Sequence, residues 1–397
     1  MAARAVVVLG GGTGGLVAAR RLRRELPPGD RVVVVERDPV YRFAPSFLWV
    51  LAGTRRPAQV CVDIRGMSRR GIEVAVTAAE GVDLARGEVA TRDGRLPYDR
   101  LVVALGAELA PAALPGFAEA AHNLYTLQGA EAAGRALVTL ERGRVAVLVS
   151  RLPYKCPAAP YEAAFLAEAL LRRRGVRDRV TVDVFTPEPY PMPTAGERIG
   201  REVAGLLASR GIGFHPGVEA EGVDAARREI LLPGGGRAGF DVLIGVPPHR
   251  APSLVAECGL AAPGGFVPVD RHTLATAADG VFALGDVTAI PVAGGRFLPK
   301  AGVFAHAQAE VVARRVASEL AGRGTGAAFD GTGACFLEVG DGAAGYASGD
   351  FYAEDGPRVR MRRPGRHWHL GKVAFERQWM WRLRRWGVRP APSPGPG

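Results

Sequence analysis

The residue types that promise redox chemistry are the four cysteines, Cys61, Cys156, Cys258 and Cys335. They form no C-x-x-C pair and no zinc-ligand spacing, so we expect neither a structural disulfide framework nor a metal site. Any disulfide in this chain would therefore take part in a reaction. Cys61 and Cys258 have no partner motif, and we interpret both as inert.

Cys156 has the most suggestive surroundings of the four. It lies in segment 151–162 (RLPYKCPAAPYE), directly after Lys155 and just before a predicted helix. The positive end of a helix dipole and a neighbouring ammonium both favour a thiolate. We therefore expect Cys156 to be a stabilised thiolate. The alternative is a buried, unreactive thiol.

A glycine-rich loop near the start of the chain has the pattern of a dinucleotide phosphate site. The run GGGTGG at 10–15 follows an apolar segment, 5–9, that indicates a buried strand, and it precedes a helical spacing. Glycines here permit a tight turn and a close approach of a pyrophosphate to the helix N-terminus. The next strand, 31–35, ends at Glu36, which is placed to accept hydrogen bonds from an adenosine ribose. A glycine-rich turn without a ligand is the alternative.

Two later segments repeat the pattern of a strand that ends in a turn of small residues. One covers 98–107, and the other, 280–286, ends in Asp286. Each is weak alone, but with the glycine loop they resemble the fixed segments of the two-dinucleotide-domain flavoproteins. In that family the aspartate at the position of Asp286 binds the ribityl chain of FAD. The resemblance therefore implies FAD at the first loop.

The second nucleotide loop expected of NAD(P)H-using members is missing. A strand is predicted at 144–150, but segment 151–162 has no glycine after it. It has prolines and the bulky side chains of Tyr154, Lys155 and Cys156 instead. A dinucleotide-binding half cannot approach a phosphate closely without those glycines. We therefore predict that the reductant is not NAD(P)H.

Segment 151–162 resembles the stretch around a redox cysteine in sulfide:quinone oxidoreductases and in the flavin subunit of flavocytochrome c sulfide dehydrogenase. Segments 298–308, 333–341 and 369–377 resemble the same family, and the resemblance runs from residue 5 to about residue 387. It implies that Cys156 and Cys335 form a redox pair, bridged in the oxidised enzyme. It also implies that sulfide is oxidised to polysulfide or sulfur while a membrane quinone is reduced.

The resemblance also suggests roles for the two cysteines. Cys335 corresponds to the thiolate that reacts with the flavin and Cys156 to the carrier of the growing persulfide, with the reverse assignment left open. Family members of one type carry a third cysteine, in some of them a site of flavin attachment, where this chain has Tyr125. The resemblance therefore implies that FAD is bound non-covalently and that the sulfur chemistry uses two cysteines.

Two charged residues complete the expected catalytic set. Glu162 lies one to two helical turns after Cys156 and is interpreted equally as a proton carrier or as a first-turn acid that complements the helix dipole. Lys300 is one of only three lysines among 51 basic residues, which favours a need for a compact point charge. Near a helix starting at about Gly302, it would stabilise negative charge at flavin N1 and O2, unless it is an ordinary surface lysine. The expected cofactor-binding residues are Gly10, Gly12, Thr13, Gly14, Gly15, Glu36, Arg37, Ala104, Gly106, Gly285, Asp286, Lys300 and Gly302.

These motifs require an α/β fold with two Rossmann-like domains of the FAD/NAD(P) type. We expect a discontinuous FAD-binding domain at 1–110 and 265–325, a second domain with a degenerate nucleotide loop at 111–264, and a C-terminal region at 326–397. A length of 397 residues with 48% apolar and 23% charged side chains is typical of a globular protein of two or three domains. No apolar stretch of 18 residues is present, so no spanning helix is expected.

The formal net charge of +11 is concentrated at the C-terminal end. Residues 358–397 hold eleven basic side chains and one acid, Glu376. This asymmetry argues against a diffuse nucleic-acid-binding surface. A helix is predicted over 371–386, with tryptophan and phenylalanine on a basic, amphipathic segment, which suits the headgroup layer of an anionic membrane. The alternative is a helix packed on its own domain or on a dimer partner. The predicted apolar stripe consists of Phe375, Trp379, Leu383 and Trp386.

Together these features predict an FAD-dependent sulfide:quinone oxidoreductase bound peripherally to the cytoplasmic side of the cell membrane, with its oligomeric state open. The cytoplasmic side is expected because the apolar run 5–9 passes into the glycine loop without a cleavage pattern. The rivals are a type II NADH:quinone dehydrogenase, a sulfide dehydrogenase with a cytochrome partner, and a redox-sensing flavoprotein with a regulatory cysteine pair. The lost second loop and the cysteine pair argue against the first, and the absence of an export signal argues against the second.

Overall fold

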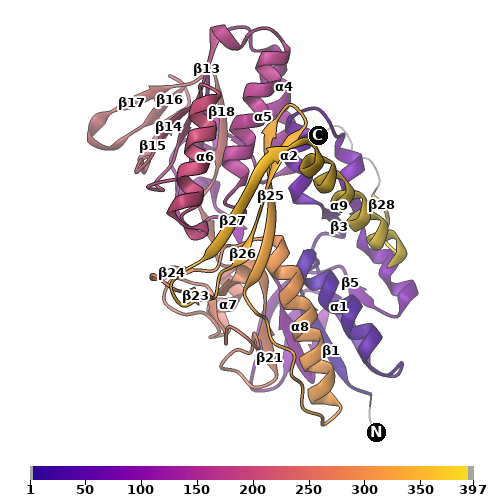
Figure 1. Cartoon of the computed structure of the whole chain (residues 1–397). Coiled ribbons are helices and arrows are strands. Elements are labelled where there is room, and N and C mark those ends of the chain that lie inside the picture. Colours follow the sequence, from indigo (N-terminus) through magenta and orange to yellow (C-terminus); the bar gives the residue numbers. More distant parts are fainter. Residues whose placement is uncertain (1–2, 392–397) are drawn as a thin grey trace.

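The structure, a computed structural model, describes residues 3–391, and a five-stranded parallel sheet forms the lower lobe in Figure 1. Its central strand is fully apolar, and Val6 to Leu9 are buried, as expected for a strand covered on both faces. Helices α1 (Thr13–Glu25) and α8 (Gly302–Leu320) pack side by side against it. In spatial order, its strands are β21 (Val281–Ala283), β9 (Arg100–Val103), β1 (Ala5–Leu9), β2 (Arg31–Val35) and β5 (Glu73–Ala75).

A second five-stranded parallel sheet forms the upper lobe (Figure 1). The expected α/β architecture with two parallel sheets is therefore confirmed. In each lobe, helices packed on the sheet connect one parallel strand to the next. The strands, again in spatial order, are β11 (His122–Asn123), β18 (Val242–Val246), β12 (Gly143–Val149), β13 (Val180–Phe185) and β14 (Gly213–His215). The helices of this lobe include α4 (Leu127–Thr139), α5 (Ala159–Arg173) and α6 (Glu197–Ser209).

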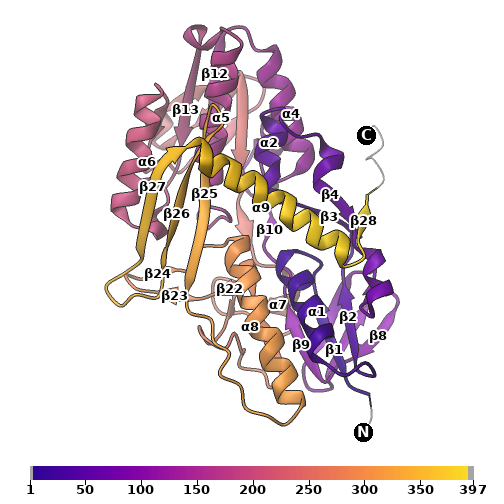
Figure 2. The same cartoon turned by 45° about the vertical axis from the view of Figure 1, so that its right-hand side comes forward.

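An antiparallel three-stranded sheet and a long helix complete the molecule. The sheet consists of β25 (Thr332–Gly340), β26 (Ala343–Asp350) and β27 (Arg358–Gly365), and α9 (Arg366–Arg385) follows it. In Figure 2, α9 runs across the molecule from the top of this sheet to the lower lobe. β25 packs against α5 so closely that a Cβ added at Gly340 would lie 2.7 Å from that of Ala169. This packing brings the segment of Cys335 to the upper lobe.

Short elements connect these layers. They are α2 (Phe47–Leu51), α3 (Phe117–Ala120) and α7 (Ser253–Glu257). Three small antiparallel sheets are formed by β3 (Val40–Arg42), β4 (Cys61–Asp63) and β28 (Arg389–Pro390), by β6 (Ala79–Asp83), β7 (Glu88–Thr91) and β8 (Gly94–Pro97), and by β15 (Gly222–Asp224), β16 (Glu229–Leu231) and β17 (Arg237–Gly239). Three paired ribbons join β10 (Glu108–Leu109) to β19 (His249–Arg250), β20 (Val267–Pro268) to β22 (Thr288–Ala289), and β23 (Pro291–Val292) to β24 (Arg296–Phe297).

The apolar stripe predicted on the C-terminal helix mostly faces inward. Trp379 and Leu383 are buried, and the Trp379 indole donates a hydrogen bond to the hydroxyl oxygen of Tyr41 at 3.1 Å. The prediction that these two side chains lie on a membrane-facing stripe is therefore wrong. They join the core because another part of the chain, which includes Tyr41, covers them. The sequence pattern of a single helix cannot reveal such a partner. No helix within residues 3–391 has both the length and the hydropathy to cross a bilayer.

Candidate active site

The glycine loop between β1 and α1 has the shape that a pyrophosphate requires. A Cβ on Gly10, whose φ is +104°, would lie 2.5 Å from the carbonyl oxygen of Ala104, and a Cβ on Gly15 would lie 1.9 Å from the carbonyl oxygen of Gly10. Both positions therefore exclude a side chain. At Gly12, by contrast, an added Cβ meets no described atom within 4 Å. The loop thus leaves open space at the N-terminus of α1, where backbone N–H groups favour a phosphate.

The neighbours of this loop hold it in place. Glu36, which follows β2, accepts a hydrogen bond from the Gly11 backbone N–H at 2.6 Å. Its carboxylate therefore adjoins the loop, which is where a ribose-binding acid must lie. Thr13 Oγ1 lies 2.9 Å from the hydroxyl oxygen of Tyr41, and Arg37 is exposed.

The turn after β21 offers a second polar group. The Gly285 N–H donates to Gln308 Oε1 at 2.7 Å. Asp286 Oδ1 is buried and has no hydrogen-bond partner among the described residues, and burial raises the pKa of this carboxyl group. A buried acceptor without a donor is unusual, and the hydroxyl groups of a ribityl chain are donors of the right kind. The open glycine loop and this carboxylate together fit FAD.

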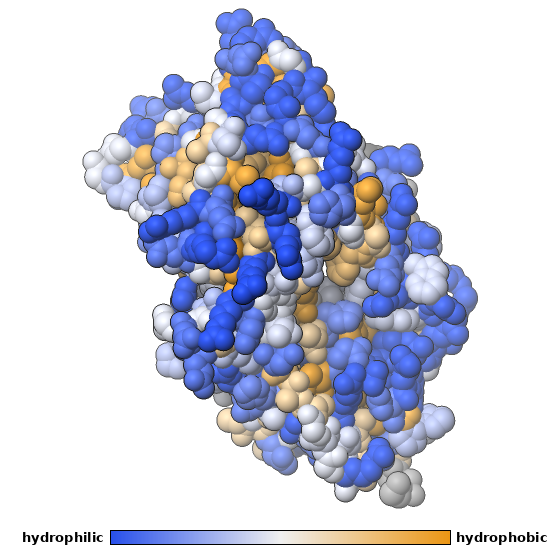
Figure 3. All heavy atoms as spheres, in the orientation of Figure 1, coloured by the Kyte–Doolittle hydropathy of each residue, from blue (hydrophilic) through white to orange (hydrophobic). Residues whose placement is uncertain are grey.

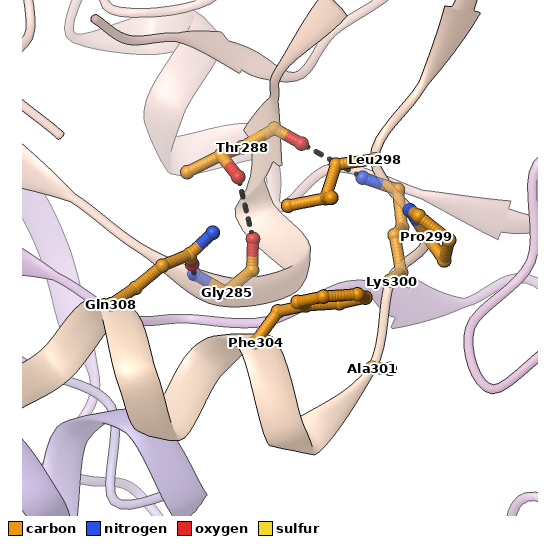
Figure 4. A pocket seen from close by; sticks show the side chains of 8 residues that line it. All are labelled: Gly285, Thr288, Leu298, Pro299, Lys300, Ala301, Phe304 and Gln308. Carbon is orange, nitrogen blue, oxygen red and sulfur yellow. Dashed lines mark hydrogen bonds between the residues drawn. The ribbon is translucent and has the colours of Figure 1, made fainter. Parts of the chain in front are cut away.

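Lys300 lies just before α8 and points its ammonium group at the same turn (Figure 4). Its Nζ donates to the carbonyl oxygens of Asp286 at 2.7 Å and Thr288 at 3.0 Å, and it lies 3.5 Å from the centre of the Phe266 ring. Burial lowers its pKa to about 8. Lys300 is therefore not an ordinary surface lysine. Two of its three N–H groups hold the turn, which leaves one for a ligand.

Cys156 comes from the upper lobe and Cys335 from the antiparallel sheet that packs on it, and the two thiols lie within electrostatic range of each other. Cys156 stands between β12 and α5 with a φ of +51°, and its N–H donates to the carbonyl oxygen of Lys300 at 2.6 Å. A left-handed backbone is strained for a residue with a side chain, and such strain gathers at active sites. Cys335 on β25 is exposed, and both thiols are free. The structure thus brings the two predicted redox cysteines into one site.

The expectation that Cys156 is a stabilised thiolate is wrong for this structure. Burial raises the pKa of the Cys156 thiol well above its usual value. The Cys335 residue keeps an exposed surface, but desolvation by the protein around its thiol raises the pKa of that group to about 11. Lys155, whose Nζ lies 5.8 Å from the centre of the Tyr125 ring, does not offset this burial, and burial also lowers the pKa of Lys155 itself. The ammonium that lowers the pKa of both thiols belongs to Lys372.

A buried ion network adjoins the thiols and joins three elements. Glu162 on α5 accepts hydrogen bonds from Lys372 Nζ of α9 at 2.6 Å and from the Glu338 N–H of β25 at 2.8 Å. Glu162 and Glu338 are only 2% and 1% exposed. Both carboxylate oxygens of Glu338 lie 3.0 Å from His369 Nδ1. Glu162 is thus the first-turn acid of α5 and also half of a buried ion pair. The position is compatible with both interpretations, a proton carrier and an acid that complements the helix dipole.

The nucleotide crevice of the second sheet is filled by side chains of the protein itself. Glu188 comes three residues after the end of β13, whereas Glu36 directly follows β2, and Glu188 is only 2% exposed. It accepts hydrogen bonds from the hydroxyl groups of Tyr154 at 3.0 Å and of Tyr161. Burial raises the pKa of Glu188 to about 7. Glu188 therefore holds the loop that carries Cys156 against the end of β13, where no glycine loop is present.

Tyr125, which lies two residues after β11, contacts the same loop. Its hydroxyl group donates to the carbonyl oxygen of Lys155 at 2.6 Å, and its ring meets that of His249 edge-on at 5.1 Å between centres. Tyr125, at which the sequence resemblance expects a third cysteine, thus holds the backbone next to Cys156.

Sequence reasoning missed four members of this site: Glu188, Glu338, His369 and Lys372. One signal was available for Lys372. The chain has only three lysines, Lys155, Lys300 and Lys372, and all three lie here. The rarity argument applied to Lys300 thus applies equally to Lys372. Within residues 3–391 the structure holds no group of three or more His, Cys, Asp or Glu side chains arranged for a metal ion.

Comparisons with known proteins agree with this geometry. The family model "Pyridine nucleotide-disulphide oxidoreductase" matches residues 4–150 and 158–310, so its break falls on the Cys156 loop. The sulfide-quinone reductase of Aquifex aeolicus is 28% identical, with 98% of this chain and 93% of that protein covered. The mitochondrial sulfide:quinone oxidoreductase of Dictyostelium discoideum is 29% identical, with 72% and 66% covered. The X-ray structure of the sulfide:quinone oxidoreductase from Aquifex aeolicus aligns with a TM-score of 0.87 at 26% identity and covers 98% of this chain and 93% of that one.

Proposed function

The chain belongs to the pyridine nucleotide-disulphide oxidoreductase family, and we propose that it is an FAD-dependent sulfide:quinone oxidoreductase. The observation that carries this proposal is the meeting of an open glycine loop, two free cysteines and a buried Glu162–Lys372 pair. When bound, FAD would supply a two-electron acceptor for the thiol chemistry and a two-electron donor for the quinone.

The sulfide step uses Cys156 and Cys335 as a disulfide in the oxidised enzyme. Hydrosulfide attacks one sulfur, a new S–S bond forms to that cysteine, the old S–S bond breaks, and the other cysteine leaves as a thiolate. Burial raises the pKa of Cys156 further than that of Cys335, and the thiol with the lower pKa leaves more readily. We therefore assign the persulfide to Cys156 and the leaving thiolate to Cys335.

Lys372 and Glu162 serve this step by electrostatics and by proton transfer. The ammonium of Lys372 lowers the pKa of both thiols, so it favours each thiolate as it forms. Glu162 lies in hydrogen-bond contact with Lys372 and acts as the first acceptor of thiol protons. On the other side of the Cys156 loop, Lys300 and Asp286 would hold the cofactor, and the remaining N–H of Lys300 would stabilise negative charge on its reduced form.

The outer face of α9 is our candidate for peripheral membrane contact. Leu370, Phe375 and Trp381 are 64%, 41% and 52% exposed on this helix. Its arginines make no ion pair among the described residues, and each basic group near an anionic surface contributes about 1 kcal/mol. These arginines are Arg366, Arg377, Arg382, Arg384 and Arg385.

Further cations lie beside this helix. Arg358, Arg360, Arg362 and Arg363 on β27 are exposed, and Figure 3 shows strongly hydrophilic side chains over that part of the molecule. We propose that this surface binds the cytoplasmic leaflet, so that a bilayer quinone reaches the site along α9. Replacing Leu370 and Trp381 by serine should reduce binding to vesicles that contain anionic lipid about ten-fold or more. Val138→Ser, which changes a 54% exposed valine on α4, is the matched control.

A type II NADH:quinone dehydrogenase is the second candidate function, and the Cys156 loop argues against it. Tyr154 and Tyr161 hold Glu188 in the place where a dinucleotide ribose would bind, and no glycine follows β12. Stopped-flow absorbance of the bound flavin separates the two activities. We expect sulfide to bleach the flavin and a soluble quinone to restore it, with no bleaching by NADH. Bleaching by NADH but not by sulfide would overturn the proposal.

A further inference from the structure

The buried ion network holds one more carboxylate than the sulfide step described above needs. Glu162 already pairs with Lys372 through a 2.6 Å contact. Glu338 lies next to this pair, with Oε1 4.0 Å from Lys372 Nζ, but its closest side-chain partner is His369. A second carboxylate at 1% exposure is costly unless a positive charge or a proton compensates it.

Charge balance assigns that proton to the pair of Glu338 and His369. Two carboxylates and one ammonium leave a net charge of −1 in the network, and one more proton makes it neutral. His369 Nδ1 lies 3.0 Å from both carboxylate oxygens of Glu338, so a proton can reside on either group without a movement of the side chains. Burial and the neighbouring Glu162 also raise the pKa of Glu338.

The network has one end that water can reach. The side chains of Glu162, Glu338 and Lys372 are 2%, 1% and 8% exposed, whereas that of His369 is 27% exposed. His369 packs edge-on against the Trp49 ring, and Arg55 stacks over the same ring at 4.7 Å. The order from the inside outward is therefore Glu162, Lys372, Glu338 and His369, each within 4.0 Å of the next.

We propose that Glu338 and His369 are the solvent end of a proton route that begins at the two thiols. Oxidation of one hydrogen sulfide molecule to the level of elemental sulfur releases two protons and two electrons. The sulfur stays on a cysteine. A bound flavin would take up the electron pair together with one of the protons, and the other proton must leave through groups that can exchange it. Glu162 has no contact with bulk water, so its proton passes by way of Lys372 to Glu338 and leaves from His369. This inference rests on the proposed function, since it concerns the protons of the same reaction.

Glu338→Gln and His369→Ala test the route in stopped-flow bleaching of the bound flavin, with sulfide and, separately, with dithiothreitol. Dithiothreitol reduces a cysteine disulfide by thiol exchange, and the two cysteine thiols so formed would release their protons when their electron pair passes to the flavin. At neutral pH both variants should bleach about ten-fold more slowly or worse with either reductant, with a larger solvent deuterium isotope effect. Added imidazole should restore much of the rate in His369→Ala. Glu168→Gln is the matched control, because Glu168 is another buried carboxylate of α5 and pairs with an arginine away from the thiols.

The outcomes separate the two claims. If dithiothreitol bleaches the wild-type flavin and sulfide does not, the proposed function fails, and the dithiothreitol rates still decide the route. If Glu338→Gln and His369→Ala bleach within about two-fold of the wild type, with an unchanged isotope effect, the thiol protons pass directly to water and the route is wrong. A loss of rate in His369→Ala that imidazole leaves unchanged would assign the network a structural role and would also overturn the proposal.

Discussion

Two crevices of this molecule have the same strand–loop–helix–strand construction and opposite contents. In the first, the loop after β1 is glycine and leaves open space at Gly12, and Glu36 at the end of β2 adjoins that space. In the second, the loop after β12 carries Tyr154 and Cys156, and Glu188 at the end of β13 is buried under tyrosine hydroxyl groups. One crevice is shaped for a ligand, and the other is filled by the chain itself.

The difference between the two loops shows how the loop position of a nucleotide-binding fold can instead hold a redox cysteine in a fixed place. Three hydrogen bonds fix the Cys156 loop. The Tyr125 hydroxyl donates to the Lys155 carbonyl oxygen, the Cys156 N–H donates to the Lys300 carbonyl oxygen, and the Tyr154 hydroxyl donates to the Glu188 carboxylate. A glycine loop would have stayed open and adaptable. Fixed partners can hold a residue in a strained left-handed conformation, as they do for Cys156, whose thiol lies within electrostatic range of Cys335.

The largest effect is expected when the open crevice is closed. In Gly12→Val the new side chain meets no described atom within 4 Å of its Cβ, so the protein should fold, yet the side chain would occupy the space of a phosphate. We expect the FAD content of the purified protein, measured by its absorbance near 450 nm, to fall about ten-fold or more, with an unchanged far-ultraviolet spectrum. A variant with full flavin content would show that the cofactor does not use this loop.

The next effect concerns what fills the second crevice. Cys156→Ser and Cys335→Ser should each slow bleaching of the flavin by sulfide about hundred-fold or more and leave FAD bound, because each removes half of the disulfide that sulfide attacks. The reaction is followed by stopped-flow absorbance. Cys258→Ser, which changes a half-buried cysteine outside this site, is the control. If either active-site variant keeps its activity with sulfide, the two-cysteine mechanism is wrong.

The first crevice was predictable from the sequence because its physics is local. Gly10 and Gly15 allow the close backbone packing of one strand–loop–helix unit, and Gly12 leaves open space in it. Glu36 follows this unit after the next strand. The absence of glycines after residue 150 was equally visible. The parallel sheets follow from the same local patterns of buried apolar strands.

The ion network beside the thiols was predictable only in part because its partners are distant in sequence. Glu162 meets Lys372 across 210 positions, and the Glu338 N–H meets Glu162 across 176. Nothing local distinguishes these residues from surface charges. The inward turn of Trp379 and the raised pKa of Cys156 have the same origin, because burial depends on what other segments cover a side chain.

Glu188→Gln gives a smaller, pH-dependent effect. The pKa of this carboxyl group is about 7 in the folded protein against an ordinary value of 4.5. A raised pKa means that the folded state binds the proton more tightly, so the contribution of Glu188 to stability is greatest at low pH and falls as pH rises from about 5 through 7. The fall amounts to about 3 kcal/mol. Urea unfolding between pH 5 and pH 8 should show a flatter profile in Glu188→Gln by this amount. An equally steep profile would mean that Glu188 is not the group that titrates.

The smallest effect should come from Tyr125→Phe, which removes one hydroxyl group from beneath the Cys156 loop. That group donates to the Lys155 carbonyl oxygen at 2.6 Å, and a single buried hydrogen bond of this kind contributes about 1 kcal/mol. Tyr352→Phe is a close control, because the Tyr352 hydroxyl donates to the Arg271 carbonyl oxygen at 2.7 Å, away from the cysteines. Both variants should lose similar stability in urea unfolding, but only Tyr125→Phe should slow bleaching by sulfide, by about two- to five-fold, because it alone loosens the backbone that aims Cys156. Equal bleaching rates in the two variants would mean that the Tyr125 hydroxyl group is not needed to hold Cys156 in position.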